Sequence, residues 1–263
     1  MPRIVSKPDT LDDLNGNYAQ ERLTRNVFIN SVPKCGTHLV RNIFRMFVPV
    51  DQQYKKAFIQ LPILDEHKQA FNPKNPELSW GHLLFSDISA FLLHETHKLV
   101  LVRDPYDWVI ARARFLLSDN FEGNMDVIKS GRVSMEEILN LMIFGMYQKA
   151  PTLQEIYTHN ALAWLGTGAK LVRFEDVLHH VKHLDTPEAE AYFSDLLSIL
   201  GHDKLPEDWR ERVRVGADRE QSGTYRDNLR GLDFEFPKEL PETQKRLVDV
   251  HAPGLRAILG YTS

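Results

Sequence analysis

Apolar residues occur in two patterns along this chain, and the two patterns alternate. Short continuous apolar runs at 27–32, 98–102 and 170–174 are typical of buried parallel strands. Segments with helical spacing or with helix-start signals lie between and after them, at 36–47, 86–95, 105–117, 134–149, 151–164, 188–200, 207–215 and 241–259. This alternation predicts a single α/β domain over 1–263. We expect a central parallel sheet with helices on both faces and ligands at the carboxyl ends of the strands.

Four segments lack a regular apolar period and are expected to form loops. They are the polar lead-in 1–24, the proline-punctuated stretch 48–80, the polar segment 118–131 and the Gly-, Arg- and Asp-rich stretch 216–238. We expect 48–80 to surround a cleft, and 216–238 to act as a lid over it.

The turn Pro33-Lys34-Cys35-Gly36-Thr37 follows the first strand and begins the helix after it. Such a unit directs backbone N–H groups and the positive end of the helix dipole into the turn. Gly36 lets a ligand approach the backbone, Lys34 adds a positive charge and Thr37 adds a hydroxyl donor. The pattern predicts a loop for phosphate or a phosphate-like anion, with a P-loop-like topology but without the Walker A spacing. Simple helix capping by Gly36 and Thr37 is the alternative.

Charge and cysteine content narrow the class of protein. The 263 residues include 32 basic and 36 acidic side chains, and the net charge of −4 argues against a broad nucleic-acid-binding surface. The single cysteine, Cys35, excludes an intramolecular disulfide and fits a reducing compartment. No apolar run reaches the ~18–20 residues of a membrane span, and residues 1–9 lack the apolar stretch of a signal peptide. We therefore expect a cytoplasmic protein.

The segment Arg103-Asp104-Pro105-Tyr106-Asp107 joins the second strand to the next helix. An arginine there is positioned to hold a phosphate, while structural pairing with Asp104 or Asp107 is the alternative. The two segments together resemble the nucleotide motifs of sulfotransferases that use 3′-phosphoadenosine 5′-phosphosulfate (PAPS). The order Pro-Lys-x-Gly-Thr resembles their 5′-phosphosulfate loop, and Arg103, Pro105 and Asp107 match their 3′-phosphate motif.

One residue departs from that second motif. Ala111 stands where the family has a serine, which removes one hydroxyl contact to the 3′-phosphate. Arg112, Arg114 and Arg230 are the candidates to replace that contact.

Two further segments resemble, more weakly, parts of the family that contact the nucleotide. Phe174 follows the third strand at the position of an aromatic residue that packs on adenine in the family, although a role in the core is the alternative. Residues 224–231 resemble the loop that closes over the 3′-phosphate, with Arg226 and Gly231 at matching positions and Arg230 as a possible helper. The lysine and the first glycine of that loop are missing.

A histidine is implied as the general base. In the family a histidine some twenty residues before the motif arginine accepts the proton of the acceptor hydroxyl, and His82 lies 21 residues before Arg103. Trp80 stands where cytosolic members often have a lysine. His38, which replaces the family's second threonine inside the anion loop, is the competing histidine for contact with the sulfuryl group or the acceptor.

The resemblance covers about residues 26–260 and implies a PAPS-dependent sulfotransferase. His82 and Lys34 are then the catalytic residues, because Lys34 stabilises the leaving phosphate oxygen. The residues implied to hold PAPS are Lys34, Cys35, Gly36, Thr37, His38, Arg103, Phe174, Arg226 and Arg230. No metal is implied, since the histidines and carboxylates lack ligand spacing.

The acceptor and two rival functions remain open at this point. Residues 48–80 and 118–150 are expected to line the acceptor pocket, and their aromatic content favours a hydroxylated, fairly apolar small molecule. A non-catalytic nucleotide-binding protein on the same fold is one alternative, and a P-loop small-molecule kinase is the other. The sequence does not determine the oligomeric state.

Overall fold

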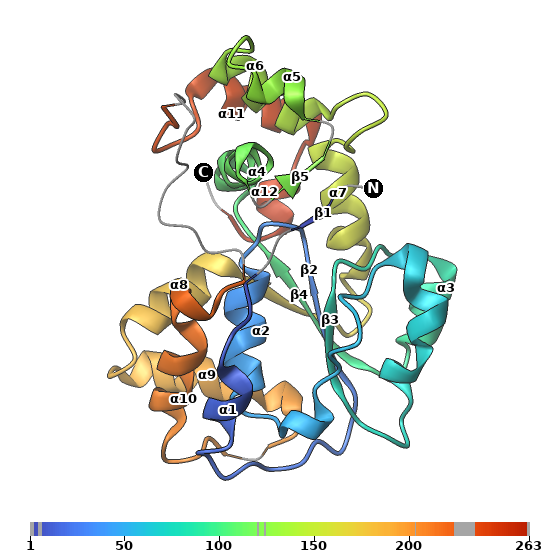
Figure 1. The fold of residues 1–263 in the computed structure, drawn as a ribbon, viewed down its shortest axis with the longest axis vertical. Coiled ribbons are helices and arrows are strands. Elements are labelled where there is room, and N and C mark those ends of the chain that lie inside the picture. Colours follow the sequence, from blue (N-terminus) through green and yellow to red (C-terminus); the bar gives the residue numbers. More distant parts are fainter. Residues whose placement is uncertain are drawn as a thin grey trace.

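Four parallel strands form the central sheet, in the order β3-β2-β4-β6 (Figure 1). They are β2 (Val27–Ser31), β3 (Leu78–Gly81), β4 (His97–Val102) and β6 (Lys170–Arg173). This computed structural model describes residues 3–4, 7–119, 121–123, 125–202, 204–223 and 235–261. The chain runs from β2 out to β3 and then returns across β2 to β4. The connections therefore reverse direction at β2, and ligands bind at the carboxyl edge beside such a switch point.

The helices alternate with these strands, and most follow the apolar pattern, whereas those at 11–15, 126–129 and 174–182 form where the sequence predicted no helix. Their bounds are α1 (Leu11–Asn15), α2 (Thr37–Arg45), α3 (Asp87–Leu92), α4 (Pro105–Leu117), α5 (Asp126–Lys129), α6 (Met135–Phe144), α7 (Leu153–Asn160), α8 (Phe174–Lys182), α9 (Pro187–Leu197), α10 (Trp209–Ala217), α11 (Glu242–His251) and α12 (Leu255–Ile258). A short antiparallel pair, β1 (Arg3–Ile4) with β5 (Phe121–Glu122), lies apart from the main sheet.

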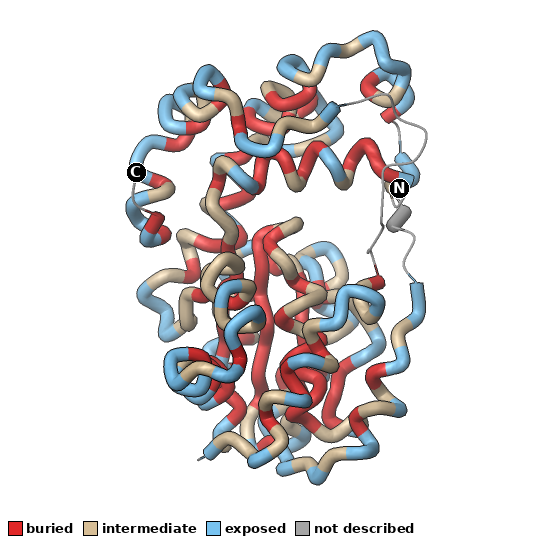
Figure 2. The backbone as a smooth tube through the Cα atoms, turned by 90° about the vertical axis from the view of Figure 1, so that its left-hand side faces the viewer, coloured by how far each residue is buried: buried red, intermediate tan, exposed pale blue. Residues whose placement is uncertain are grey.

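Helices cover both faces of the sheet, as two adjacent residues of β2 demonstrate. Side chains of neighbouring strand residues point to opposite faces. Ser31 Oγ lies 2.7 Å from Thr37 Oγ1 at the start of α2, whereas Asn30 Nδ2 donates to the carbonyl of Asn160 at the end of α7. Figure 2 shows the buried strands between these more exposed layers. The predicted α/β class, with a central parallel sheet flanked by helices, is confirmed.

Strand β3 lies in the stretch 48–80, for which the sequence predicted only loops. All four of its residues are buried, and Val27 of β2 pairs with Leu78 at its start. A Cβ on Gly81 would lie 2.0 Å from the carbonyl oxygen of Ile59, so only glycine permits this close packing. Four residues are too few to show a period, and pairing with β2 makes this segment a strand.

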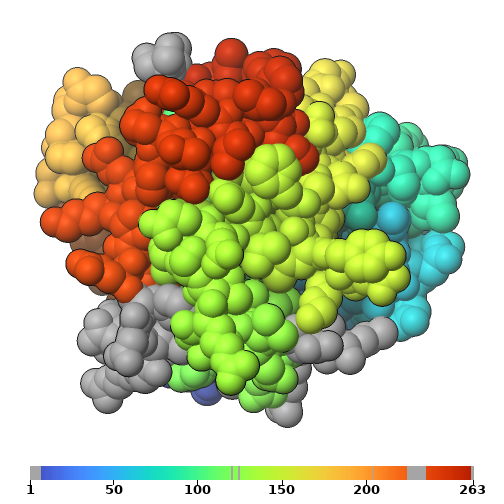
Figure 3. All heavy atoms as spheres, turned by 90° about the horizontal axis from the view of Figure 1, so that it is seen from above, coloured from blue at the N-terminus to red at the C-terminus, as the bar shows by residue number. Residues whose placement is uncertain are grey.

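Two predicted helices end earlier than the apolar pattern indicates. Helix α6 ends at Phe144 because Gly145 has φ 81° and ψ 177°, which no helix accommodates. The predicted helix 241–259 is divided into α11 and α12, with Gly254 in the left-handed region (φ 73°) between them. Seen from above, the segments that contain α6 and α11 lie side by side (Figure 3), and both lie above the sheet in the view of Figure 1.

Candidate functional site

The segment 33–38, which the sequence predicts to bind an anion and which we call the anion loop, connects β2 to α2. Its backbone is held at several points. Lys34 and Gly36 both have left-handed backbone angles (φ 71° and 86°), which turn the chain tightly between strand and helix. Trp108 Nε1 donates to the carbonyl of Pro33 at 2.6 Å, and the backbone N–H of Val32 donates to Leu101 at 3.0 Å. The fixed loop leaves the first amide groups of α2, the positive end of its dipole, at the carboxyl edge of the sheet.

Lys34 provides a positive charge that has no counter-ion among the described residues. Its Nζ lies 3.4 Å above the centre of the Phe115 ring, and it forms no ion pair within that part of the chain. Burial lowers the pKa of Lys34 to about 8. A partly desolvated ammonium ion that has no carboxylate partner is stabilised strongly when an anion binds beside it. The reason is that the attraction between opposite charges is stronger where water is excluded.

His82 is held in one tautomer by the end of β2. Its Nδ1 lies 2.9 Å from the carbonyl oxygen of Ser31 and 3.0 Å from Ser31 Oγ. A carbonyl oxygen only accepts hydrogen bonds, so Nδ1 carries the proton and Nε2 carries the lone pair. Burial lowers the pKa of His82 to about 4. The hydrogen bond to Ser31 raises this pKa, and the charge of Lys34 lowers it further. At neutral pH this imidazole is therefore uncharged, with Nε2 available to accept a proton.

His38 lies close enough to His82 and Lys34 to interact with both electrostatically. Burial, followed by the charges of Arg41, Lys34 and His82, lowers its pKa to about 3. Its Nδ1 is buried and has no hydrogen-bond partner among the described residues. The structure thus brings both candidate histidines to the anion loop.

Arg103 and Phe174 lie at the ends of neighbouring strands and meet beside the same loop. The guanidinium of Arg103 is 4.9 Å from the centre of the Phe174 ring, and a Cβ on Gly36 would lie 2.3 Å from that ring. Asp104 does not pair with Arg103, because its carboxylate binds Arg256 at 2.9 Å. Arg103 Nε is buried without a partner in the described ranges. The arginine therefore has donor capacity left for a ligand.

Arg112 does not supply the phosphate contact that a serine in place of Ala111 would make. Both guanidinium ends of Arg112 donate to backbone carbonyls, of Met142 and Pro151, each at 2.9 Å. Arg112 is buried and structural, and the hypothesis that it replaces the serine is wrong. Arg114 is exposed, with its guanidinium 5.4 Å from the ring of Phe236. Arg226 and Arg230 lie outside the described residues, as does the loop 224–231.

Sequence reasoning missed several residues that organise the site. Ser31 links His82 to Thr37, and Trp108 fixes the loop at Pro33. The carboxylate of Glu175 accepts from the backbone N–H of Asp104 at 3.1 Å and from the hydroxyl of Tyr261 at 2.7 Å, which joins two strand ends. The only available signal was the position of Ser31 and Glu175 next to strand ends, where ligand sites of parallel sheets form.

The aromatic residues expected to line an acceptor pocket have different positions. Phe58 meets His82 edge-on, with the ring centres 4.6 Å apart. Phe71 and Met142 are buried in the core, and Tyr147 is 89% exposed. Among those expected residues, the contact with His82 identifies Phe58 as a neighbour of the proposed base.

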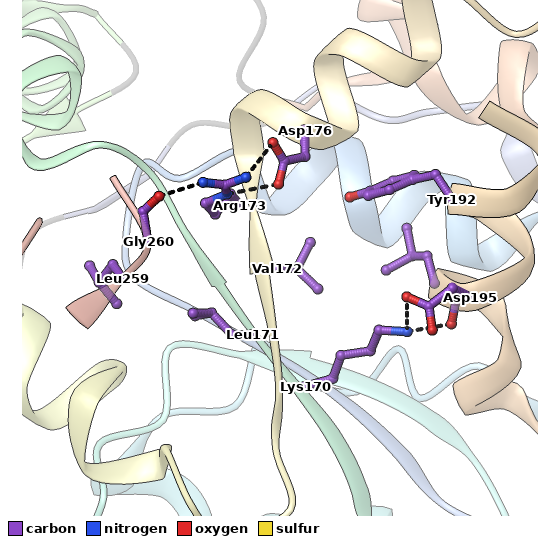
Figure 4. Close-up of a pocket in the computed structure, with 10 residues that line it drawn as sticks. Lys170, Leu171, Val172, Arg173, Asp176, Tyr192, Asp195, Leu259 and Gly260 are labelled. Carbon is purple, nitrogen blue, oxygen red and sulfur yellow. Dashed lines mark hydrogen bonds and ion pairs between the residues drawn. The ribbon is translucent and has the colours of Figure 1, made fainter. Parts of the chain in front are cut away.

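A separate cavity of about 270 Å³ opens beside the outer edge of β6 (Figure 4). Its charged side chains neutralise each other, because Lys170 pairs with Asp195 at 2.9 Å and Arg173 pairs with Asp176 at 2.8 Å. None of its lining residues belongs to the anion loop. Lys34 and Arg103, which form no ion pair within the described ranges, lie at the loop, and the loop remains the candidate site.

No group of three or more His, Cys, Asp or Glu residues is arranged to hold a metal ion in the part of the chain that the structure describes. Within the same ranges, every helix is too short or too polar for a membrane span.

Comparisons with known proteins agree with the fold. No family model matches the chain, and no curated protein matches it. Mouse sulfotransferase SULT7A1 complexed with PAP has a similar structure, with a TM-score of 0.58 and 14% identity over 92% of this chain and 86% of that one. A retinol dehydratase in complex with androsterone and the inactive cofactor PAP gives a TM-score of 0.45 and 14% identity, over 74% of this chain and 65% of that one. The first likeness shows that this chain has the sulfotransferase fold.

Proposed function

We propose that this protein transfers the sulfuryl group of PAPS to a hydroxyl of a small-molecule acceptor. The observation that carries the proposal is the pairing of two groups at one loop. His82 has its Nδ1 proton bound by Ser31, which leaves Nε2 basic, and the uncompensated charge of Lys34 acts on the same imidazole. A base beside an anion loop is the arrangement that in-line transfer to a hydroxyl requires.

In the proposed reaction, His82 Nε2 accepts the proton of the acceptor hydroxyl. The acceptor oxygen forms a bond to sulfur as the bond from sulfur to the 5′-phosphate oxygen breaks. The electron pair of that bond remains on the leaving phosphate oxygen, where Lys34 and the amides of the anion loop stabilise it. The products are the sulfate ester and adenosine 3′,5′-bisphosphate (PAP), and His82 then loses its proton to solvent.

The nucleotide is proposed to lie between the loop and the ends of β4 and β6. Cys35, Gly36, Thr37 and His38 would surround the 5′-phosphosulfate with backbone and side-chain donors. The free donor capacity of Arg103 supports a contact to the 3′-phosphate, and the Phe174 ring beside Gly36 supports stacking on the adenine. Arg226 and Arg230 are proposed to contact the 3′-phosphate as well. A cytoplasmic location belongs to the proposal, supported by the single reduced thiol of Cys35.

Calorimetry with two nucleotides tests this function without knowledge of the acceptor. We expect adenosine 3′,5′-bisphosphate to bind at least about tenfold more tightly than ATP with Mg²⁺, because Arg103 meets a 3′-phosphate that ATP lacks. The reverse order of affinity would favour the small-molecule kinase. Tight bisphosphate binding without transfer from PAPS to any hydroxylated compound would favour the non-catalytic nucleotide-binding protein.

The variant Arg103→Ala is expected to weaken binding of adenosine 3′,5′-bisphosphate about ten- to a hundredfold and that of adenosine 5′-phosphate far less. The reason is that a charge-assisted bond to the 3′-phosphate is worth about 1.5–3 kcal/mol. Titration calorimetry with both ligands measures the difference. Equal losses for the two nucleotides would mean that Arg103 only supports the fold.

Arg112→Met provides the matched control on the next helix. It removes a guanidinium that donates to two buried carbonyls, so the free energy of unfolding should fall by about 2–4 kcal/mol. Its affinity for the bisphosphate should stay unchanged while the protein is folded. A tenfold loss of affinity here would return Arg112 to the nucleotide site.

The pH profile of kcat/KM is expected to be broad, with limbs set by His82 and Lys34. His82 acts only when neutral, and since burial lowers its pKa to about 4, activity should fall only as the pH drops towards that value. Lys34 acts only when charged, and its lowered pKa of about 8 predicts a loss of activity as the pH rises past that value. Initial rates between pH 4 and pH 10 measure both limbs. An acid limb near 6.5, the ordinary histidine pKa, that persists in His38→Ala would contradict the burial of His82.

A further inference from the structure

Arg41 is a cation close to the proposed acceptor side that the proposed reaction does not use. It lies on α2 one turn after His38, and its guanidinium is 5.3 Å from the centre of the Trp80 ring. Trp80 lies in β3, and His82 directly follows the end of that strand. His82 Nδ1 lies 3.0 Å from Ser31 Oγ, which contacts the first residue of α2. Arg41 therefore lies on the side of the sheet that His82 faces.

The charge of Arg41 is only partly compensated. Asp9 is bound by Arg45 at 2.8 and 3.0 Å, and Arg41 Nη2 is 3.7 Å from it. Asp12 is likewise bound by Arg45, at 2.7 Å, and by Lys55. Three cations thus share two carboxylates, and Arg41 has the longest contact of the set.

The donors of Arg41 are also incompletely used. Its Nε and Nη2 both donate to the single oxygen Asn42 Oδ1, at 3.1 and 2.9 Å, while Nη1 has no partner among the residues that the structure describes. The side chain is only 13% exposed, so water compensates the charge poorly. Burial and the neighbouring charge of Arg45 lower the pKa of Arg41 to about 10, which still leaves it charged at neutral pH.

The order of the groups along the site follows from helix α2. His38 lies in the first turn of this helix, next to the anion loop, and Arg41 lies one turn further along it. Burial lowers the pKa of His38 most, and the charges of Arg41 and Lys34 both lower it further. The buried Nδ1 of His38 lacks a hydrogen-bond partner in the described ranges. A polar atom without a partner therefore lies one helical turn from the partly compensated charge of Arg41.

We propose that the acceptor carries an oxyanionic group, such as a carboxylate, in addition to its hydroxyl, and that Arg41 binds this group. This inference rests on the proposed sulfotransferase function. The hydroxyl is then directed to His82 Nε2, the oxyanion forms a charge-assisted bond to the free Nη1 of Arg41, and His38 contacts the part of the acceptor between them. Arg41 is a residue of acceptor specificity in this arrangement, not of bond cleavage.

Pairs of acceptors that differ only in the anionic charge test the inference. The probes are 4-hydroxyphenylacetate with its methyl ester and lithocholate with its methyl ester, each sulfated from PAPS at saturating concentration. We expect kcat/KM of the wild type to favour the acid over the ester by at least about tenfold in one pair or both. In Arg41→Gln this preference should disappear, mainly through a raised KM for the acid, and in Arg41→Lys a large part of it should remain because the charge is kept.

Arg22→Gln is the matched control, since it removes an exposed arginine that pairs with Asp51 at 2.9 Å on the surface. It should leave the acid-to-ester ratio and the affinity for adenosine 3′,5′-bisphosphate unchanged. Arg41→Gln should also keep that affinity, which shows in the same measurement that the variant is folded.

Four outcomes would overturn the inference. The first is equal use of acid and ester by the wild type, and the second is a preference for the acid that survives in Arg41→Gln. The third is a wild type that sulfates neutral hydroxylated compounds but none of these four probes, and the fourth is a loss of bisphosphate affinity in Arg41→Gln. The last outcome would assign Arg41 to the nucleotide. Failure of the proposed function looks different, because the wild type would then transfer the sulfuryl group to no hydroxylated compound or would not bind the bisphosphate.

Discussion

Replacing His82 with alanine is expected to abolish sulfuryl transfer while the affinity for adenosine 3′,5′-bisphosphate changes less than about threefold. General-base catalysis by a positioned side chain typically contributes about 10²–10⁴ in rate, and the bond of Nδ1 to Ser31 leaves Nε2 of His82 as the atom that accepts the proton. The nucleotide is proposed to bind on the side of the sulfuryl group that is opposite to His82 and the acceptor. Single-turnover rates from PAPS, together with calorimetry of the bisphosphate, separate the two effects.

Two further variants make this prediction specific. His82→Asn keeps a hydrogen-bond donor near Ser31 but should remain inactive, because an amide does not accept a proton at neutral pH. His38→Ala should damage transfer less than either change at His82. An active His82→Ala protein paired with an inactive His38→Ala protein would assign the base to the histidine inside the anion loop.

The variant Lys34→Ala is expected to lower the rate of transfer about 10²–10³-fold, with the loop backbone retained. Lys34 is half-buried, its ammonium group lies over the Phe115 ring, and it has no counter-ion in the described ranges, so its charge is available to the leaving oxygen. The native lysine already has φ 71°, so alanine adds no new kind of backbone strain at this position. Lys34→Gln is a second test that keeps most of the side-chain length and removes the charge.

Lys34→Arg is the control for this change. It keeps the charge and should retain more activity than Lys34→Gln, although the planar guanidinium fits the space over Phe115 differently. Rates close to wild type in both Lys34→Ala and Lys34→Gln would mean that the loop does not stabilise the leaving group.

The central strands and the loop between β2 and α2 were predictable because each has a local signal. Continuous apolar runs predicted β2, β4 and β6, and the Pro-Lys-x-Gly-Thr turn predicted the anion loop between strand and helix. Strand β3 had no such signal, because its four residues become a strand only through pairing with β2. Its edge position and the close packing of Gly81 on Ile59 are tertiary facts.

The positions of the candidate residues near the loop were easier to predict than their protonation states and partners. The position of His82 relative to Arg103 singled it out, but its tautomer depends on Ser31, which lies 51 residues earlier and meets it only in the folded sheet. The structural role of Arg112 was hidden from the sequence for the same reason. Its partners, the carbonyls of Met142 and Pro151, are distant in sequence, and no local pattern reveals that they occupy the guanidinium.

The measurement that tests the central claim most directly is transfer from PAPS that carries a radioactive sulfuryl group. Purified wild-type protein would be incubated with this PAPS and a mixture of hydroxylated small molecules, acids and neutral compounds included, and labelled products would be separated by chromatography. The account predicts labelled sulfate esters that are formed by the wild type and are absent with His82→Asn at equal nucleotide occupancy. Equal labelling by the two proteins, or none by a wild type saturated with PAPS, would contradict it.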